Sequence, residues 1–162
     1  SHGRAVDQRC CTGCLEATTS ISAARHCFAA ALLKAACQCL ADDTPVLMVC
    51  FDHPLPEPLA AAYPLIAPLA IGLALSPAPT ASSKARLDLD WDTQGNESGT
   101  PPSAEALAPL WSGNPAGHGL PLLEMIARMQ SQEIRLPGSP GATRSMKSTS
   151  WSRRRGQLLV TG

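Results

Sequence analysis

One helical segment, predicted from about His26 to Leu40, places the strongest constraint on what this chain can fold into. Small or apolar residues occupy nearly every position from Cys27 to Ala36, and Lys34 is the one charge in that stretch. A helix that is apolar on all sides is buried in a protein core or in a membrane. At about four turns this one is too short to span a bilayer. The segment is therefore predicted to be a buried core helix.

Two β-type segments flank this helix. Thr18–Ala23 is rich in β-branched residues, and Pro45–Phe51 is a continuous apolar run of the kind found in strands buried on both faces. The polar turn Asp42–Thr44 separates the helix from the second run. Strand, helix and strand in this order form a right-handed crossover that joins parallel strands. The chain is therefore predicted to belong to the α/β class.

The stretch Thr18–Pro58, together with residues 113–128 (GNPAGHGLPLLEMIAR), resembles the ketoacyl-synthase-like domain of chain-length-factor-type proteins in the β-ketoacyl synthase (thiolase-fold) superfamily. The shared features are a Thr-rich strand, an Ala/Leu-rich helix, an acidic turn, an apolar strand and the tail Leu55–Pro58. The resemblance implies a partial thiolase-like layered fold that contains the buried Ala-rich helix.

The resemblance divides the chain into three parts. Residues 1–17 do not match and are expected to be a separate N-terminal segment, so the domain is interpreted as truncated or rearranged. Residues 18–136 form the partial ketoacyl-synthase-like domain. Residues 137–162 are rich in Ser, Gly, Arg and Thr without hydrophobic periodicity, and are predicted to be disordered or loosely packed.

Further elements are predicted inside the partial domain. Short helices are expected at Leu59–Tyr63, at Ser103–Trp111 with Ser103 as N-cap, and at Leu120–Gln130. Strands are expected at Leu69–Leu75 beside Pro45–Phe51, at Leu87–Trp91 on a sheet edge, and at Glu133–Leu136.

The turn before the long helix decides which chemistry the resemblance allows. Condensing enzymes of this superfamily carry a nucleophilic Cys there, where the helix N-terminus lowers the thiol pKa. The resemblance places Arg25, or a residue next to it, at this turn, and an Arg cannot form an acyl thioester. Cys27 follows two residues later and is the candidate catalytic residue if the turn is displaced. The simpler interpretation of Cys27 is a buried helix residue.

The histidines do not supply a catalytic set. The two histidines that assist decarboxylation in the superfamily lie in a second half-domain, which has no counterpart in this sequence. His26 is interpreted as a residue of the helix N-terminus. His53 and His118, the latter within Gly117–Gly119, are interpreted as solvated loop residues.

Seven cysteines are present, and Cys10, Cys11 and Cys14 cluster near the start. The spacing Cys11-x-x-Cys14 would need a second pair to hold zinc and a thioredoxin-like unit for redox chemistry. Neither follows, so no metal and no cofactor is predicted, although a zinc-binding module stays an alternative. The odd number of cysteines and the lack of a visible secretory signal favour reduced thiols in the cytoplasm.

The overall charge and the apolar segments exclude two classes of partner. Lys and Arg balance Asp and Glu at 13 each, so neither nucleic acid nor an anionic membrane surface is predicted as a partner. Pro64 and Pro68 interrupt the apolar stretch Ala60–Pro77, which argues against a membrane span.

By resemblance, the chain is a β-ketoacyl synthase-like protein of fatty-acid, polyketide or polyene chain assembly. It is expected to be a non-catalytic or chain-length-type partner of a condensing enzyme. The implied partners are an acyl carrier protein and a condensing-enzyme subunit. The chain would form a homo- or heterodimer, in which Thr18–Ala23 would face the partner subunit. Two alternatives stay open: an active acyltransferase that uses Cys27, and a degenerate fragment without independent function.

Overall fold

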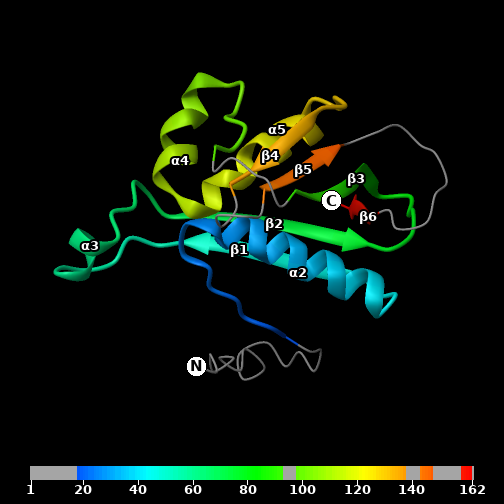
Figure 1. The fold of residues 1–162 in the computed structure, drawn as a ribbon, viewed down its shortest axis with the longest axis horizontal. Helices are drawn as coiled ribbons and strands as arrows, with labels where there is room; N and C mark the ends of the chain where they lie inside the picture. The colour runs from blue at the N-terminus through cyan, green and yellow to red at the C-terminus, as the bar shows by residue number, and fades with distance from the viewer. Residues whose placement is uncertain (1–17, 93–97, 138–142, 148–157, 162) are drawn as a thin grey trace.

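The computed structural model describes residues 18–92, 98–137, 143–147 and 158–161 (Figure 1). Their strands form one six-stranded sheet in the order β1-β2-β6-β3-β5-β4, with each neighbouring pair antiparallel. The strands are β1 (Val46–Asp52), β2 (Leu69–Ser76), β3 (Ser83–Asp92), β4 (Glu133–Leu136), β5 (Thr143–Lys147) and β6 (Leu158–Thr161). The helices are α2 (Cys27–Ala41), α3 (Leu59–Ala62), α4 (Ala108–Gly113) and α5 (Leu120–Ala127), with the 3₁₀ turns η1 (Ala24–His26), η2 (Glu105–Leu107) and η3 (Pro115–Gly119).

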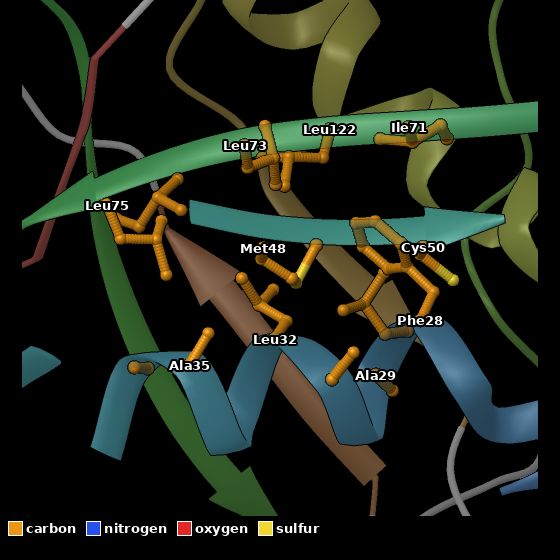
Figure 2. Packing of buried hydrophobic residues seen from close by; sticks show 14 of the residues in the cluster. Phe28, Ala29, Leu32, Ala35, Met48, Cys50, Ile71, Leu73, Leu75 and Leu122 are labelled. Atoms are coloured by element: carbon orange, nitrogen blue, oxygen red, sulfur yellow. The ribbon is translucent and has the colours of Figure 1, made fainter. Parts of the chain in front are cut away.

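Helix α2 lies along β1 and β2 and buries one stripe of its surface (Figures 1 and 2). The buried positions follow the helical period and are Phe28, Ala29, Ala31, Leu32, Ala35, Ala36 and Cys39. Lys34, Cys37 and Leu40 are exposed on the rest of the helix. The predicted helix is confirmed, but the expectation of burial all round is wrong, because the sheet and η3 cover only one side.

The helix ends where the polar turn was predicted. The N–H of Asp42 donates to the carbonyl of Gln38 at 2.9 Å, which closes the last helical turn. Asp43 then adopts a φ of 50°, the left-handed conformation that stops a helix and that Asp tolerates better than most residues. The chain reverses there and enters β1.

Strands β1 and β2 pair antiparallel over their whole length, from Val46 opposite Leu75 to Asp52 opposite Leu69. The side chains that point toward α2 are Met48 and Cys50 from β1 and Ile71, Leu73 and Leu75 from β2 (Figure 2). Leu122 of α5 reaches the same cluster beside Leu73 (Figure 2). One continuous hydrophobic core therefore joins α2, the β1–β2 pair and α5.

The other face of β1 is open. Leu47, Val49 and Phe51 are 72%, 55% and 69% exposed. Their cross-strand neighbours on β2 are Ala74, Gly72 and Ala70. The prediction that Pro45–Phe51 is buried on both faces is therefore wrong, because β1 is an edge strand that the described elements cover on one face only.

The predicted parallel crossover is also not formed. Thr18–Ala23 is not a strand, and residues 18–22 are exposed. β1 pairs with β2, the strand that follows it, and the two strands are antiparallel. β-Branched residues favour extended backbone, but a strand also needs a pairing partner, which Thr18–Ala23 lacks in the described part of the chain.

The predicted helix Ser103–Trp111 is replaced by two shorter elements, η2 and α4. Ser103 makes no side-chain cap; its backbone N–H donates instead to the Glu124 carboxylate at 2.6 Å, as the N–H of Ala104 does at 2.9 Å. Glu124 also pairs with Arg128 at 2.9 Å. A carboxylate on α5 therefore holds the start of this segment, a long-range contact that local sequence cannot reveal.

The remaining elements agree with the sequence in part. The predicted strands at β2 and β4 and the short helix at α3 are confirmed, whereas α5 ends at Ala127, earlier than expected. Strand β3 contains the predicted Leu87–Trp91 segment but lies inside the sheet, between β6 and β5. Strands β5 and β6 pair with β3, so the expected disorder after residue 137 does not hold for those two segments. The division into three parts stays a prediction.

None of the helices in the described ranges is both long enough and apolar enough to cross a bilayer. Ala60–Pro77 contributes most of α3, a connection, and β2.

Replacement of Leu32 by Ala tests the core. Leu32 is 1% exposed and faces β1, so Leu32→Ala is expected to lower the free energy of unfolding by about 2–5 kcal/mol, measured by urea denaturation. Leu47→Ala is the matched control, because Leu47 is 72% exposed and its loss should cost within about 0.5 kcal/mol. Equal costs for the two variants would contradict this packing. A broad, non-cooperative transition of the unmodified chain would favour the degenerate-fragment alternative.

Candidate functional site at the start of helix α2

A sharp turn leads the chain into α2. Ala24 has a φ of 47°, a left-handed conformation that costs a non-glycine residue about 1–2 kcal/mol. The N–H of His26 donates to the carbonyl of Ala23 at 2.9 Å, which closes η1. The strained residue therefore stands at the entry to α2, the place where backbone strain most often accompanies function.

Cys27 is the first residue of α2, and its side chain points back toward the turn. The N–H of Ala23 donates to the Cys27 Sγ at 3.2 Å, and the side chain is half-buried. Arg25 lies in the turn itself and is exposed. His26 occupies the N-cap position, as its interpretation as an N-terminal helix residue predicted. Cys27 is half-buried and its sulfur faces the turn, so the geometry is compatible with either interpretation of Cys27.

The turn η3 packs closely on the start of α2. A Cβ on Gly119 would lie 2.3 Å from the Phe28 ring, and one on Gly117 would lie 2.2 Å from the carbonyl oxygen of Leu110. Only glycine fits at either position, since carbon atoms in contact stay above about 3.5 Å.

Two polar contacts anchor η3 to the sheet side. The N–H of Ala116 donates to the Asp52 Oδ2 at 2.7 Å, at the end of β1. The Asn114 Nδ2 donates to the carbonyl of Ala67 at 2.7 Å, just before β2. The loop between α4 and α5 is therefore held in place by glycine packing on one side and by hydrogen bonds on the other.

Two imidazoles meet at this junction. The Nδ1 atoms of His26 and His118 are buried without a hydrogen-bond partner among the described residues, as is the Trp111 Nε1. The rings of Trp111 and His118 contact edge to face, with their centroids 5.9 Å apart. The interpretation of His118 as a solvated loop residue is wrong, because it lies half-buried in η3. His53 is exposed, as predicted.

The environment disfavours the charged forms of three groups. Burial lowers the pKa of His118, the nearby cations of His26 and Arg25 act in the same direction, and a backbone hydrogen bond at Arg25 and the Asp52 carboxylate oppose the change. Burial raises the pKa of Cys50 to about 12, with the Asp52 charge adding to it. Burial also raises the pKa of Cys39. Cys39 and Cys50 are therefore core thiols and not nucleophiles at neutral pH.

The described residues contain no group of three His, Cys, Asp or Glu side chains placed to hold a metal ion. The predicted cluster of Cys10, Cys11 and Cys14 lies outside the described residues, so the zinc alternative stays untested.

Sequence reasoning located the turn but missed the residues that contact it from elsewhere in the chain. Asp52, Trp111 and Asn114 stand 27 to 89 positions after Arg25. Asp52 and Asn114 lie within the stretches that carry the family resemblance, but no local pattern indicates that these residues reach the junction between α2 and η3. The one available signal was the pair of glycines around His118, which indicates close backbone approach.

A profile of the family "Beta-ketoacyl synthase, N-terminal domain" matches residues 11–132, about three quarters of the chain. No curated protein and no solved structure gives a significant match. The match covers well over half of the chain, so the chain is a ketoacyl-synthase-like domain. This chain belongs to the β-ketoacyl synthase N-terminal domain family, which implies a thiolase-like α/β fold. The match begins within residues 1–17, the segment interpreted as unrelated.

Substitution of Gly119 tests the packing of η3 on α2. Gly119→Ala is expected to lower the free energy of unfolding by about 1–3 kcal/mol, because the new methyl group collides with the Phe28 ring. The control is Gly72→Ala, whose methyl group would meet only the Met48 carbonyl oxygen at 3.9 Å and should leave stability unchanged or slightly raised. Thermal denaturation of both variants measures the difference, and a harmless Gly119→Ala would refute the close contact.

Proposed function

We propose that this chain is a non-catalytic or chain-length-type subunit that works beside a condensing enzyme and an acyl carrier protein. The process is fatty-acid, polyketide or polyene chain assembly in the cytoplasm. Membership of the ketoacyl synthase family supports the process. The observation that carries the non-catalytic role is Arg25, an exposed cation at the turn where the family resemblance expects a nucleophilic thiol.

A second candidate rests on Cys27. Its sulfur stands at the first position of a 15-residue helix and accepts the backbone N–H of Ala23 at 3.2 Å. The side chain is only half-buried, so the sulfur is within reach of a substrate at the turn. In this alternative the thiolate attacks an acyl thioester, forms a new thioester at Cys27 and releases the carrier thiol.

Acyl loading separates the two candidates. The full chain is incubated with a short-chain acyl-CoA and, separately, with the corresponding acyl carrier protein, and intact mass is then measured. The proposed function predicts that the unmodified chain gains no more acyl adduct than the Cys27→Ala variant does, because no nucleophile stands at the turn. Cys37→Ala is the control for unspecific reaction, since Cys37 is an exposed thiol on the same helix.

A mass increase that disappears in Cys27→Ala and persists in Cys37→Ala would overturn the non-catalytic role and establish the second candidate. Arg25→Cys provides a positive test of the turn. If the turn retains the geometry of the family's nucleophile position, this variant should gain an acyl adduct that the unmodified chain lacks.

The open face of β1 supports a role as a subunit. Leu47, Val49 and Phe51 form an apolar row of three side chains, each more than half exposed, on an edge strand. Edge strands of monomers are normally protected by charges or prolines, whereas β1 carries only Asp52 at its end. An edge strand of this kind, without charges and with an apolar face, can bind a sheet edge of another protein. We propose that this partner is a condensing-enzyme subunit.

Val49→Lys tests this surface. We expect the chain to form a complex with a purified condensing enzyme of fatty-acid synthesis, detected by light scattering after size-exclusion chromatography. Val49→Lys should abolish the complex, because a charge would be buried in an apolar contact. Leu59→Lys is the matched control, since Leu59 is 57% exposed but lies in α3, away from the row. A complex insensitive to Val49→Lys would refute the surface, and self-association alone would refute the proposed partner.

A further inference from the structure

The contact between η3 and the start of α2 contains an arrangement that the proposed function does not use. His26 at the N-cap of α2 and His118 in η3 each bury an Nδ1 atom that finds no partner among the described residues. The indole of Trp111 packs against the His118 ring and buries its own unpartnered Nε1. Buried polar atoms normally have hydrogen-bond partners, so three orphans at one junction call for an explanation.

The hydrogen-bonding requirements of imidazole provide that explanation. A neutral imidazole has one N–H donor and one acceptor nitrogen, whereas the imidazolium has two N–H donors that both need acceptors. At His118 the Nδ1 atom has no acceptor in reach among the described residues, so the protonated form would leave a charged N–H unsatisfied in a buried site. The closed contact therefore accommodates the neutral ring of His118 and disfavours the charged one.

The charged neighbours of His118 do not compensate for a second proton. Positive charge on Arg25 and His26, on the α2 side, opposes a proton on His118. Asp52 on β1 is the carboxylate that faces His118. Asp52 already accepts the N–H of Ala116 at 2.7 Å.

Among the described elements packed against η3, the other carboxylate is Glu124 of α5, which already binds Ser103, Ala104 and Arg128. Strand β2 and helix α4 contain no titratable side chain. The remaining titratable groups on the elements that contact η3 are Lys34 and four cysteines, Cys27, Cys37, Cys39 and Cys50, and none of these is a carboxylate.

We propose that η3 is an acid-sensitive latch on the start of α2, which opens when His118 takes up a proton. Opening breaks the contact of Gly119 with Phe28 and frees the turn Ala24–His26, so acid would alter the position that decides the chemistry of the family. The latch rests on the imidazole cluster alone and does not depend on the proposed function.

The direction of the pH effect follows from linkage. Burial lowers the pKa of His118 in the folded chain, so the unfolded chain binds the proton more tightly. The contact is at full strength above about pH 6.5, the ordinary pKa of histidine, and weakens as the pH falls below it. For each proton taken up, the ratio of closed to open chain falls by up to about tenfold per pH unit between the two pKa values.

Trp111 reports on the latch directly, because a protonated imidazole in contact with an indole quenches its fluorescence. The experiment uses the full chain with the substitutions Trp91→Phe and Trp151→Phe, which leave Trp111 as the only tryptophan. The emission of Trp111 is recorded from pH 8 to pH 4.5. We expect one reversible step with a midpoint below about 6.5. His118→Phe keeps an aromatic ring in place and should abolish the step, whereas His53→Gln, at an exposed position, should leave it unchanged.

Urea denaturation measures the same linkage. The urea midpoint of the unmodified chain should fall between pH 7 and pH 5, and the fall should be smaller in His118→Phe. If His118→Phe does not fold, His118→Gln replaces it, and NMR titration of the imidazole signals of the unmodified chain gives the pKa of His118 without any substitution. A His118 midpoint at or above 6.5, a fluorescence step that survives removal of His118, or a urea midpoint independent of pH would each refute the latch.

Discussion

Phe28 is the contact on which this structure depends. It is fully buried on the first turn of α2, where it packs against the β1–β2 pair and against Gly119 of η3 (Figure 2). Burial of a Phe side chain contributes about 1.5–3 kcal/mol. Because helix, sheet and loop all meet at this ring, displacement of any one of them would expose the core at the same point. The site at the start of α2 is therefore closely packed on its inner side, although Arg25 on the outer side is exposed.

The sequence was informative where structure is local. The position of α2, its stop at the polar turn, and the strands β1, β2 and β4 follow from periodicity and turn residues, because these signals act within one element. The sequence predicted that β2 would lie beside β1, but not that the two strands would pair antiparallel or that β3, β5 and β6 would join the same sheet. Thr18–Ala23 has the composition of a strand but no pairing partner among the described residues, and the apolar run of β1 is buried on one face only. Pairing and coverage are long-range properties, and periodicity does not determine them.

Only the part of the candidate site that is contiguous in the sequence was predictable. Arg25, His26 and Cys27 are adjacent in the chain, so the resemblance could place them at one turn. Asp52 and His118 reach that turn through β1 and η3, and their contacts depend on glycine packing that no local pattern specifies. Sequence reasoning interpreted His118 as solvated because a Gly-rich segment normally indicates an exposed loop. Here the glycines on either side of His118, which have no side chain, allow the segment to pack closely and be buried.

The charges at the start of α2 are unfavourable for a helix N-terminus. The N-terminus of α2 favours negative charge, yet Arg25 places a cation in the turn before it, and the first turn of the helix has no acidic residue. Burial lowers the pKa of His118, and its buried Nδ1 has no partner among the described residues, so a neutral His118 avoids a second cation beside Arg25. The non-catalytic role and the acid-sensitive latch that we propose therefore both involve the positive charge of Arg25.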